Sequence, residues 1–288
     1  MIPPPGAHGG DGLRVAAAMG RAVLDLSMSL NPVAPDVTDA LIRHLAAARR
    51  YPDSADATRA LADAIGTGPD RVLLTNGGAE AIALVAADLG GGVTAEPDFS
   101  ILPRGDGLTW RSNPHNPTGS LAPADARVGV WDEAFYPLAT GEWTRGDNDV
   151  VVVGSLTKLF ACPGLRLGYV LTDDVERFAR RQPEWSVNGL ASAVLPDLLE
   201  AADLRGWAKQ IADLRADLTR LLAPFHPQPS DANWVLCADA PRLRERLARR
   251  GVLVRDCASF GLPGQARIGV PDNAGLEQLE EALCRLGD

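Results

Sequence analysis

The sequence predicts an α/β fold, in which helices cover a mostly parallel sheet, with a smaller α+β unit at the C-terminal end. Short apolar runs rich in β-branched residues, typical of buried parallel strands, alternate with a helical stretch and loops over residues 71–171. Beyond residue 175 this alternation gives way to two long helical stretches, and then to shorter strands and helices. The change of pattern indicates a large domain joined by helices to a small one.

The N-terminal part predicts an arm followed by two helices. Residues 1–12 are rich in Pro and Gly and favour irregular structure. Residues 36–49 carry apolar side chains at helical spacing, and residues 58–65 form a second helical stretch that Gly66 closes. We therefore assign residues 1–35 to an N-terminal arm.

The remaining elements divide between two domains, a large one over residues 36–205 and a small one over residues 206–288. In the large domain we expect strands at 71–74, 93–95, 128–131, 150–153 and 167–171, and a helix at 79–89. Helical stretches at 190–204 and 207–222 lead into the small domain, where we expect strands at 234–237, 252–255 and 266–270 and helices at 242–249 and 276–286.

Composition and charge argue against several classes of function. The net charge of −9 is unfavourable for binding nucleic acid or an anionic membrane. The four cysteines form no CxxC pair and no Cys/His cluster with zinc-like spacing, so no metal site is expected. No apolar run approaches the roughly 20 residues of a membrane span, and residues 1–12 lack the apolar core of a signal peptide. We expect a soluble cytoplasmic protein.

Lys158 is the strongest candidate for chemistry, and the chain has only one other lysine, Lys209. It follows the apolar strand at 150–153, where burial would lower the pKa of the amine and make it nucleophilic toward an aldehyde. The neighbouring Ser155, Thr157 and Arg166 could bind a dianionic phosphate. The competing interpretation is a loop lysine in an ordinary salt bridge. We set it aside because the lysine, the two hydroxyls and the arginine occur together in one segment, residues 154–169.

That string resembles the signature of class I/II aminotransferases, S-x-[ST]-K followed by P-G-L-R-x-G-Y. Further family signatures occur in the expected order, at residues 51–53, 75–82, 113–119 and 132–135. The resemblance covers the chain from about His8 onward. It implies the fold type I architecture of pyridoxal-phosphate (PLP) enzymes, with PLP held on Lys158 as a Schiff base.

The resemblance also implies roles for individual residues around the cofactor. Asp132 would keep the pyridine nitrogen protonated, and Asn116 would bond the phenolic oxygen. Phe99 would stack on the ring, although it could equally be a core residue. The start of the helix after Gly77 would offer its N–H groups to the cofactor phosphate. In a homodimer, Tyr51 of the partner subunit would also reach this phosphate. The remaining cofactor candidates are therefore Gly77, Gly78, Ala79, Ser155, Thr157, Arg166 and Tyr51.

The substrate candidates come from the two ends of the chain. Arg267 resembles the family arginine that clamps the substrate α-carboxylate. Arg255 resembles the arginine with which relatives bind the phosphate of a phosphorylated amino acid, although a surface arginine is a nearly equal alternative. His8 and Asn31 complete the predicted substrate site.

The resemblance leaves the reaction open. His8-Gly9-Gly10-Asp11, and Phe135 where most aminotransferases place a Tyr, favour a threonine-phosphate decarboxylase of cobalamin biosynthesis. The alternative is a histidinol-phosphate-type aminotransferase that uses 2-oxoglutarate and glutamate. A hypothesis of another class is a degenerate, non-catalytic subunit that binds PLP or a metabolite.

The last hypothesis arises because the chain departs from the family in one region. Only 34 residues separate Gly78 from Asn113, where relatives carry a further strand–helix–strand stretch. Candidate strands remain at 93–95 and 108–111, but a helix between them has nowhere to sit. We therefore expect the large domain to be shortened between residues 79 and 112, which puts the stacking role of Phe99 in question.

Overall fold

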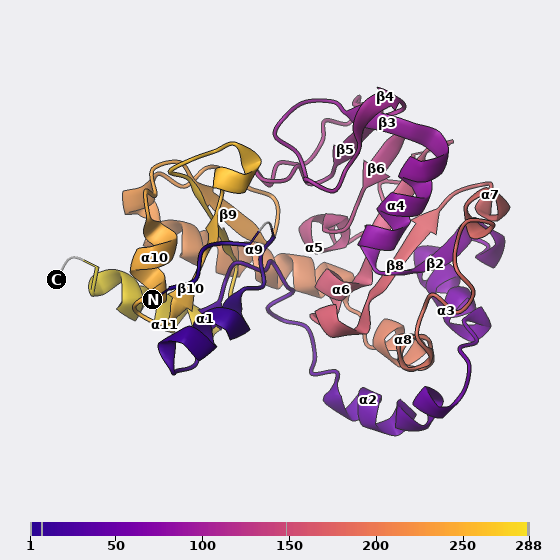
Figure 1. Ribbon diagram of the computed structural model, residues 1–288, viewed down its shortest axis with the longest axis horizontal. Coiled ribbons are helices and arrows are strands. Elements are labelled where there is room, and N and C mark those ends of the chain that lie inside the picture. Colours follow the sequence, from indigo (N-terminus) through magenta and orange to yellow (C-terminus); the bar gives the residue numbers. More distant parts are fainter. Residues whose placement is uncertain (1, 7, 148, 287–288) are drawn as a thin grey trace.

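The computed structural model describes residues 2–6, 8–147 and 149–286, which form two lobes (Figure 1). The larger lobe contains a seven-stranded sheet. The smaller lobe contains both ends of the described chain. Helix α9 (Leu204–Leu221) runs from one lobe to the other and packs on α5 (Tyr136–Thr140) of the large lobe and on α11 (Asn273–Cys284) of the small one.

The large sheet is mixed and has the strand order β2-β8-β7-β6-β5-β3-β4. Five strands share one direction, while β8 and the edge strand β4 run the opposite way. The predicted strands are confirmed within a few residues, as β2 (Val72–Asn76), β3 (Gly90–Val93), β4 (Arg104–Gly107), β5 (Thr109–Ser112), β6 (Val130–Asp132), β7 (Val151–Ser155) and β8 (Leu167–Leu171), with β4 as an unpredicted addition.

Helices cover both faces of this sheet, which explains its apolar strands. On β7, Val152 packs into one core cluster with helices α3 (Ala55–Ile65) and α8 (Gly189–Glu200), whereas Val153 packs on the opposite face against α4 (Gly78–Leu89). Because successive side chains of a strand point to opposite faces, both must be apolar when both faces are buried. The remaining helices of this lobe are α2 (Thr38–His44), α6 (Leu156–Leu159) and α7 (Val175–Ala179).

The small lobe contains an antiparallel sheet of order β11-β12-β9. Its elements lie where they are expected, except that the single strand expected at 252–255 is divided into β10, which pairs with β1, and β11, which pairs with β12. They are β9 (Trp234–Cys237), α10 (Leu243–Ala248), β10 (Val252–Leu253), β11 (Arg255–Asp256), β12 (Ala266–Gly269) and α11.

The N-terminal segment packs on this small lobe, although it is far away in sequence. Strand β1 (Leu24–Asp25) pairs in parallel with β10, and Val15 of α1 (Gly12–Met19) packs with Ala248 and Leu253. The described residues before Gly12 are irregular, as expected, and the rest of the arm contains a helix and a strand.

The expected shortening between residues 79 and 112 is visible as a glycine-rich edge of the sheet. Residues 94–103 join β3 to β4 without a helix, as predicted. At Gly91 the backbone has φ +116°, and a Cβ there would come within 2.2 Å of the Leu108 carbonyl oxygen. The edge strands approach so closely that only glycine fits at this position.

Within the described residues, no helix is long and apolar enough to cross a membrane.

Candidate active site

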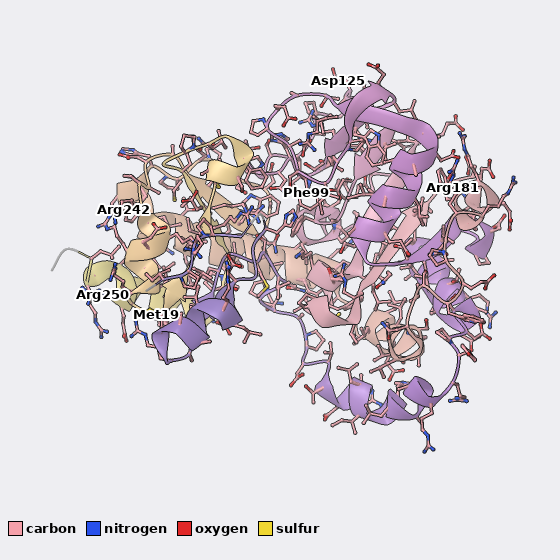
Figure 2. All side chains as sticks on the ribbon, in the orientation of Figure 1. Met19, Phe99, Asp125, Arg181, Arg242 and Arg250 are labelled. Atoms are coloured by element: carbon pink, nitrogen blue, oxygen red, sulfur yellow. The ribbon has the colours of Figure 1, made fainter. Side chains whose placement is uncertain are left out.

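A cavity of about 290 Å³ lies where the two lobes meet, at the carboxyl ends of β5, β6 and β7. The large lobe, the N-terminal arm and the small lobe all contribute lining residues. The lining includes His8, Gly78, Ala79, Phe99, Asn116, Asp132, Ser155, Thr157, Lys158, Arg166, Arg255 and Arg267. Figure 2 labels Phe99 near the junction of the lobes.

Lys158 enters this cavity from α6, the single helical turn that follows β7. Burial, and then the positive charges of Arg267 and Arg166, lower the pKa of its amine to about 8. The adjoining backbone is anchored to the arm, because the Asn31 N–H donates to the Lys158 carbonyl over 3.0 Å. The site therefore presents a largely desolvated amine that is more nucleophilic at neutral pH than an ordinary lysine.

An anion cradle lies beside this amine. Gly78 and Ala79 begin the first turn of α4, and Ser155 Oγ at the end of β7 lies 2.8 Å from Thr157 Oγ1 in α6. Arg166 also lines the cavity and contacts Gly77, where φ is +79° and a Cβ would lie 2.3 Å from Nη2 of Arg166. A helix N-terminus, two hydroxyls and a guanidinium group together suit a phosphate dianion.

Asp132 lies at the end of β6 and is 6% exposed. Burial raises the pKa of its carboxyl to about 7, against the opposing effect of the Ala134 N–H, which donates to Oδ1 over 3.1 Å. A carboxyl group in such a dry site is stabilised as an anion only by a cation brought to it. The protonated ring nitrogen of a pyridine meets that requirement, so the cradle, the amine and this carboxyl together fit PLP.

Asn116 and Arg267 connect the lobes across the cavity. The Arg267 guanidinium donates to Asn116 Oδ1 over 2.6 Å, and it lies 5.0 Å above the ring of Trp234. Trp234 in turn donates from Nε1 to the Pro117 carbonyl over 2.8 Å and packs edge-on against Phe135. Because Arg267 is buried, the pKa of its guanidinium is lowered to about 10, a cost that an anionic substrate group would offset.

Arg255 and His8 lie on the arm side of the same cavity. Arg255 donates to Ser259 Oγ over 2.7 Å and lies 5.5 Å from the Phe260 ring centroid. The His8 ring meets Phe99 edge-on at 6.1 Å, and burial followed by the nearby charges of Arg255 and Lys158 lowers its pKa. Arg267 lies 5.9 Å from the Phe260 ring centroid, so Arg255 and Arg267 form a second cationic region around Phe260, whereas Arg166 of the cradle lies against Gly77.

Three predicted site residues do not line the cavity. Tyr51 is 78% exposed and stacks on Trp185, with ring centroids 4.6 Å apart. The Asn31 side chain donates to the Leu159 carbonyl and accepts from the Val33 N–H, so the structure gives it a role in holding the Lys158 loop. Gly77 packs against the Arg166 guanidinium, and a side chain at this position would collide with it.

Several residues that line or support the site could not be identified from the sequence. Ser27, Ser29, Ser112 and Phe260 line the cavity, and Asp98 accepts hydrogen bonds from Ser112. The only signal for Asp98 and Ser112 was their position next to motif residues. The serines at 27 and 29 had no signal, because the pairing of β1 with β10 brings them there.

Comparisons with known proteins agree with this geometry. The family model "Aminotransferase class I and II" matches residues 107–286. Histidinol-phosphate aminotransferase 1 of Dechloromonas aromatica is 28% identical over an alignment, gaps included, of 334 positions, which covers 91% of this chain and 90% of the relative.

Two solved structures share the fold. The histidinol-phosphate aminotransferase of Sinorhizobium meliloti in complex with pyridoxal-5'-phosphate superimposes with a TM-score of 0.81 at 20% identity, covering 99% of this chain and 95% of the other. The L-threonine-O-3-phosphate decarboxylase of Porphyromonas gingivalis does so with a TM-score of 0.76 at 21% identity, covering 91% and 99%.

Proposed function

The chain belongs to the class I and II aminotransferase family of PLP-dependent enzymes, and we propose that it transaminates a phosphorylated amino compound of the histidinol phosphate type. The observation that carries this proposal is that one cavity holds two separate cationic regions around a lysine amine. The cradle of α4, Ser155, Thr157 and Arg166 suits the cofactor phosphate. Arg255 and Arg267 come from strands of the small lobe, lie 5.5 Å and 5.9 Å from the centroid of the same Phe260 ring, and suit a second anion. The named relative is a histidinol-phosphate aminotransferase, which supports the same substrate class.

Three residues of this chain would perform the chemistry. The cofactor, when bound, supplies an electron-withdrawing ring that weakens the bonds at the substrate Cα. Asp132 holds the proton at the ring nitrogen, because its buried carboxylate needs a cationic partner. Lys158 holds the cofactor and, once released, carries a proton to and from the substrate, for which a pKa of about 8 suits its amine. Asn116 is held by Arg267 and orients the cofactor's phenolic side.

A second candidate reaction is the decarboxylation of a phosphorylated amino acid such as O-phosphothreonine. It is favoured by Phe135, which brings no hydroxyl to the cavity lining, and by His8 in the same lining. We also propose that the enzyme is a homodimer in which Tyr51 reaches the cofactor site of the partner subunit, since in a single chain its ring is exposed.

The deciding experiment measures products. The protein is purified with PLP and incubated either with histidinol phosphate and 2-oxoglutarate or with O-phosphothreonine alone. Glutamate from the first mixture supports the transaminase, and carbon dioxide from the second replaces it with the decarboxylase. Bound cofactor with neither product would identify a non-catalytic binding subunit.

A further inference from the structure

The loop at residues 94–103 carries part of the cavity wall although it contains no regular structure. Phe99 and Ile101 of this loop both line the cavity. Phe99 is the ring that meets His8, and it is partly buried against the α4 side of the core. A loop of this kind loses considerable conformational entropy when it is ordered. Something must therefore hold its backbone in place.

Arg104, the first residue of the edge strand β4, supplies most of the contacts that could do so. Its guanidinium donates to the carbonyl oxygens of Asp98 over 2.9 Å and of Phe99 over 2.8 Å, and also to that of Leu102. The same group pairs with the Glu96 carboxylate, with Nε 2.8 Å from Oε1. One planar guanidinium group thus binds four residues of the loop: Phe99 itself and residues on both sides of it in the sequence.

Asp98 anchors the loop from its inner side. This residue is 3% exposed, and its carboxylate accepts from the Phe99 N–H over 2.7 Å and from the Ser112 N–H over 3.2 Å. Ser112 Oγ donates to this carboxylate and accepts from the Asn116 N–H over 2.9 Å. Hydrogen bonds therefore hold the backbone around Phe99 from two directions. Arg104 binds its carbonyl oxygens, and Asp98 binds Ser112 at the end of β5.

We propose that Arg104 is a positioning residue that holds Phe99 against the cofactor position and so sets the affinity for PLP, although it does not line the cavity. The inference rests on the cofactor site described under the proposed function. Its physical basis is that a loop already ordered by five guanidinium hydrogen bonds loses little further entropy when the ring binds beside it. A lysine carries the same charge, but it cannot reach these acceptors with one planar group.

The test compares Arg104→Gln and Arg104→Lys with the unchanged protein. Hydrogen–deuterium exchange of the cofactor-free protein should become faster over residues 96–103 in Arg104→Gln and stay unchanged in α3, α8 and the small lobe. The dissociation constant for PLP, from titration of the visible absorbance and circular dichroism, should rise about tenfold in Arg104→Gln. Arg104→Lys should recover only part of this loss.

Arg127→Gln is the matched control. Arg127 also donates to loop carbonyls, those of Ala124 and Ala126, but it lies outside the cavity lining, so PLP affinity should not change. Unaltered exchange and PLP affinity in Arg104→Gln, or full recovery with lysine, would overturn the proposal. If the unchanged protein bound no PLP, the proposed function would fail by itself, whereas the exchange measurement would still decide whether Arg104 orders the loop.

Discussion

Lys158 and Asp132 are both shifted toward their uncharged forms while the cofactor is not bound. Burial is the largest cause in each case, lowering the pKa of the amine to about 8 and raising that of the carboxyl to about 7. Burying these two groups therefore lowers the free energy of unfolding at the pH values where both would be charged in water. Bound PLP would provide a cationic partner for the Asp132 carboxylate.

Replacing Lys158 by Ala should abolish both the visible absorbance of the Schiff base with PLP and turnover, since Lys158 is the only lysine among the residues described as lining the cavity. Lys209→Ala is the control, because Lys209 is the only other lysine and is exposed on α9. Absorbance spectra and product assays of both variants check this. Turnover in Lys158→Ala would disprove the assignment of Lys158 as the residue that holds PLP.

Asp132→Asn should stabilise the cofactor-free protein at pH 8 while weakening PLP binding. The pKa of Asp132 is 3.8 when unfolded and about 7 when folded, so the unchanged protein loses stability as pH rises from about 4 to about 7. Asparagine does not titrate and keeps the oxygen that accepts from the Ala134 N–H. Urea unfolding across this pH range should show an advantage for the variant that grows to the order of 4 kcal/mol. An advantage independent of pH would contradict the assignment.

At the scale of elements, the site depends on close contact between α4 and β8. A Cβ on Gly168 of β8 would lie 2.4 Å from the Gly77 carbonyl carbon and 2.5 Å from the Gly78 nitrogen. The absence of a side chain there lets the first turn of α4 settle beside Ser155 and Arg166. The phosphate cradle is thus shaped by a strand that does not line it.

Gly168→Ala should therefore displace the start of α4. We expect a loss of about 1–3 kcal/mol in the free energy of unfolding, together with weaker binding of PLP. Gly164→Ala is the matched control, because no atom lies within 4 Å of its Cβ position, and its effect should stay within about 0.5 kcal/mol. Chemical unfolding and PLP titration measure both effects, and equal behaviour of the two variants would disprove this account.

At the scale of the whole molecule, the cavity exists only because three distant parts of the chain meet. The arm brings His8, the large lobe brings Lys158, and the small lobe brings Arg255 and Arg267. Tyr51 is the exception, since its exposed ring faces Trp185 away from this cavity. A second copy of the chain is the partner that would complete the proposed arrangement.

Mixing two defective variants tests the shared site. If Tyr51→Ala impairs the site of the partner and Lys158→Ala impairs its own site, a mixed dimer combines both defects in one site and leaves the other intact. Random mixing in equal amounts should restore about a quarter of the unchanged activity per chain. Light scattering gives the oligomeric state. A monomer that is fully active would contradict the proposal.

The sequence by itself determined most strands, most helices and the position of Lys158 next to two hydroxyl-bearing residues at the end of a buried strand. These features are local: apolar runs predict buried strands, and Ser155, Thr157 and Lys158 stand within one turn of the end of β7. Spacing along the chain therefore placed them correctly without knowledge of distant contacts.

Only the tertiary structure decided the contacts between residues far apart in sequence. Arg267 bonds Asn116 across 151 residues, the arm pairs with β10, and Asn31 holds the Lys158 loop. The role proposed for Arg104 could not be predicted from the sequence, because it depends on how the carbonyl oxygens of residues 98–102 are arranged around its guanidinium group. Such contacts depend on how the elements pack, and local periodicity carries no information about that packing.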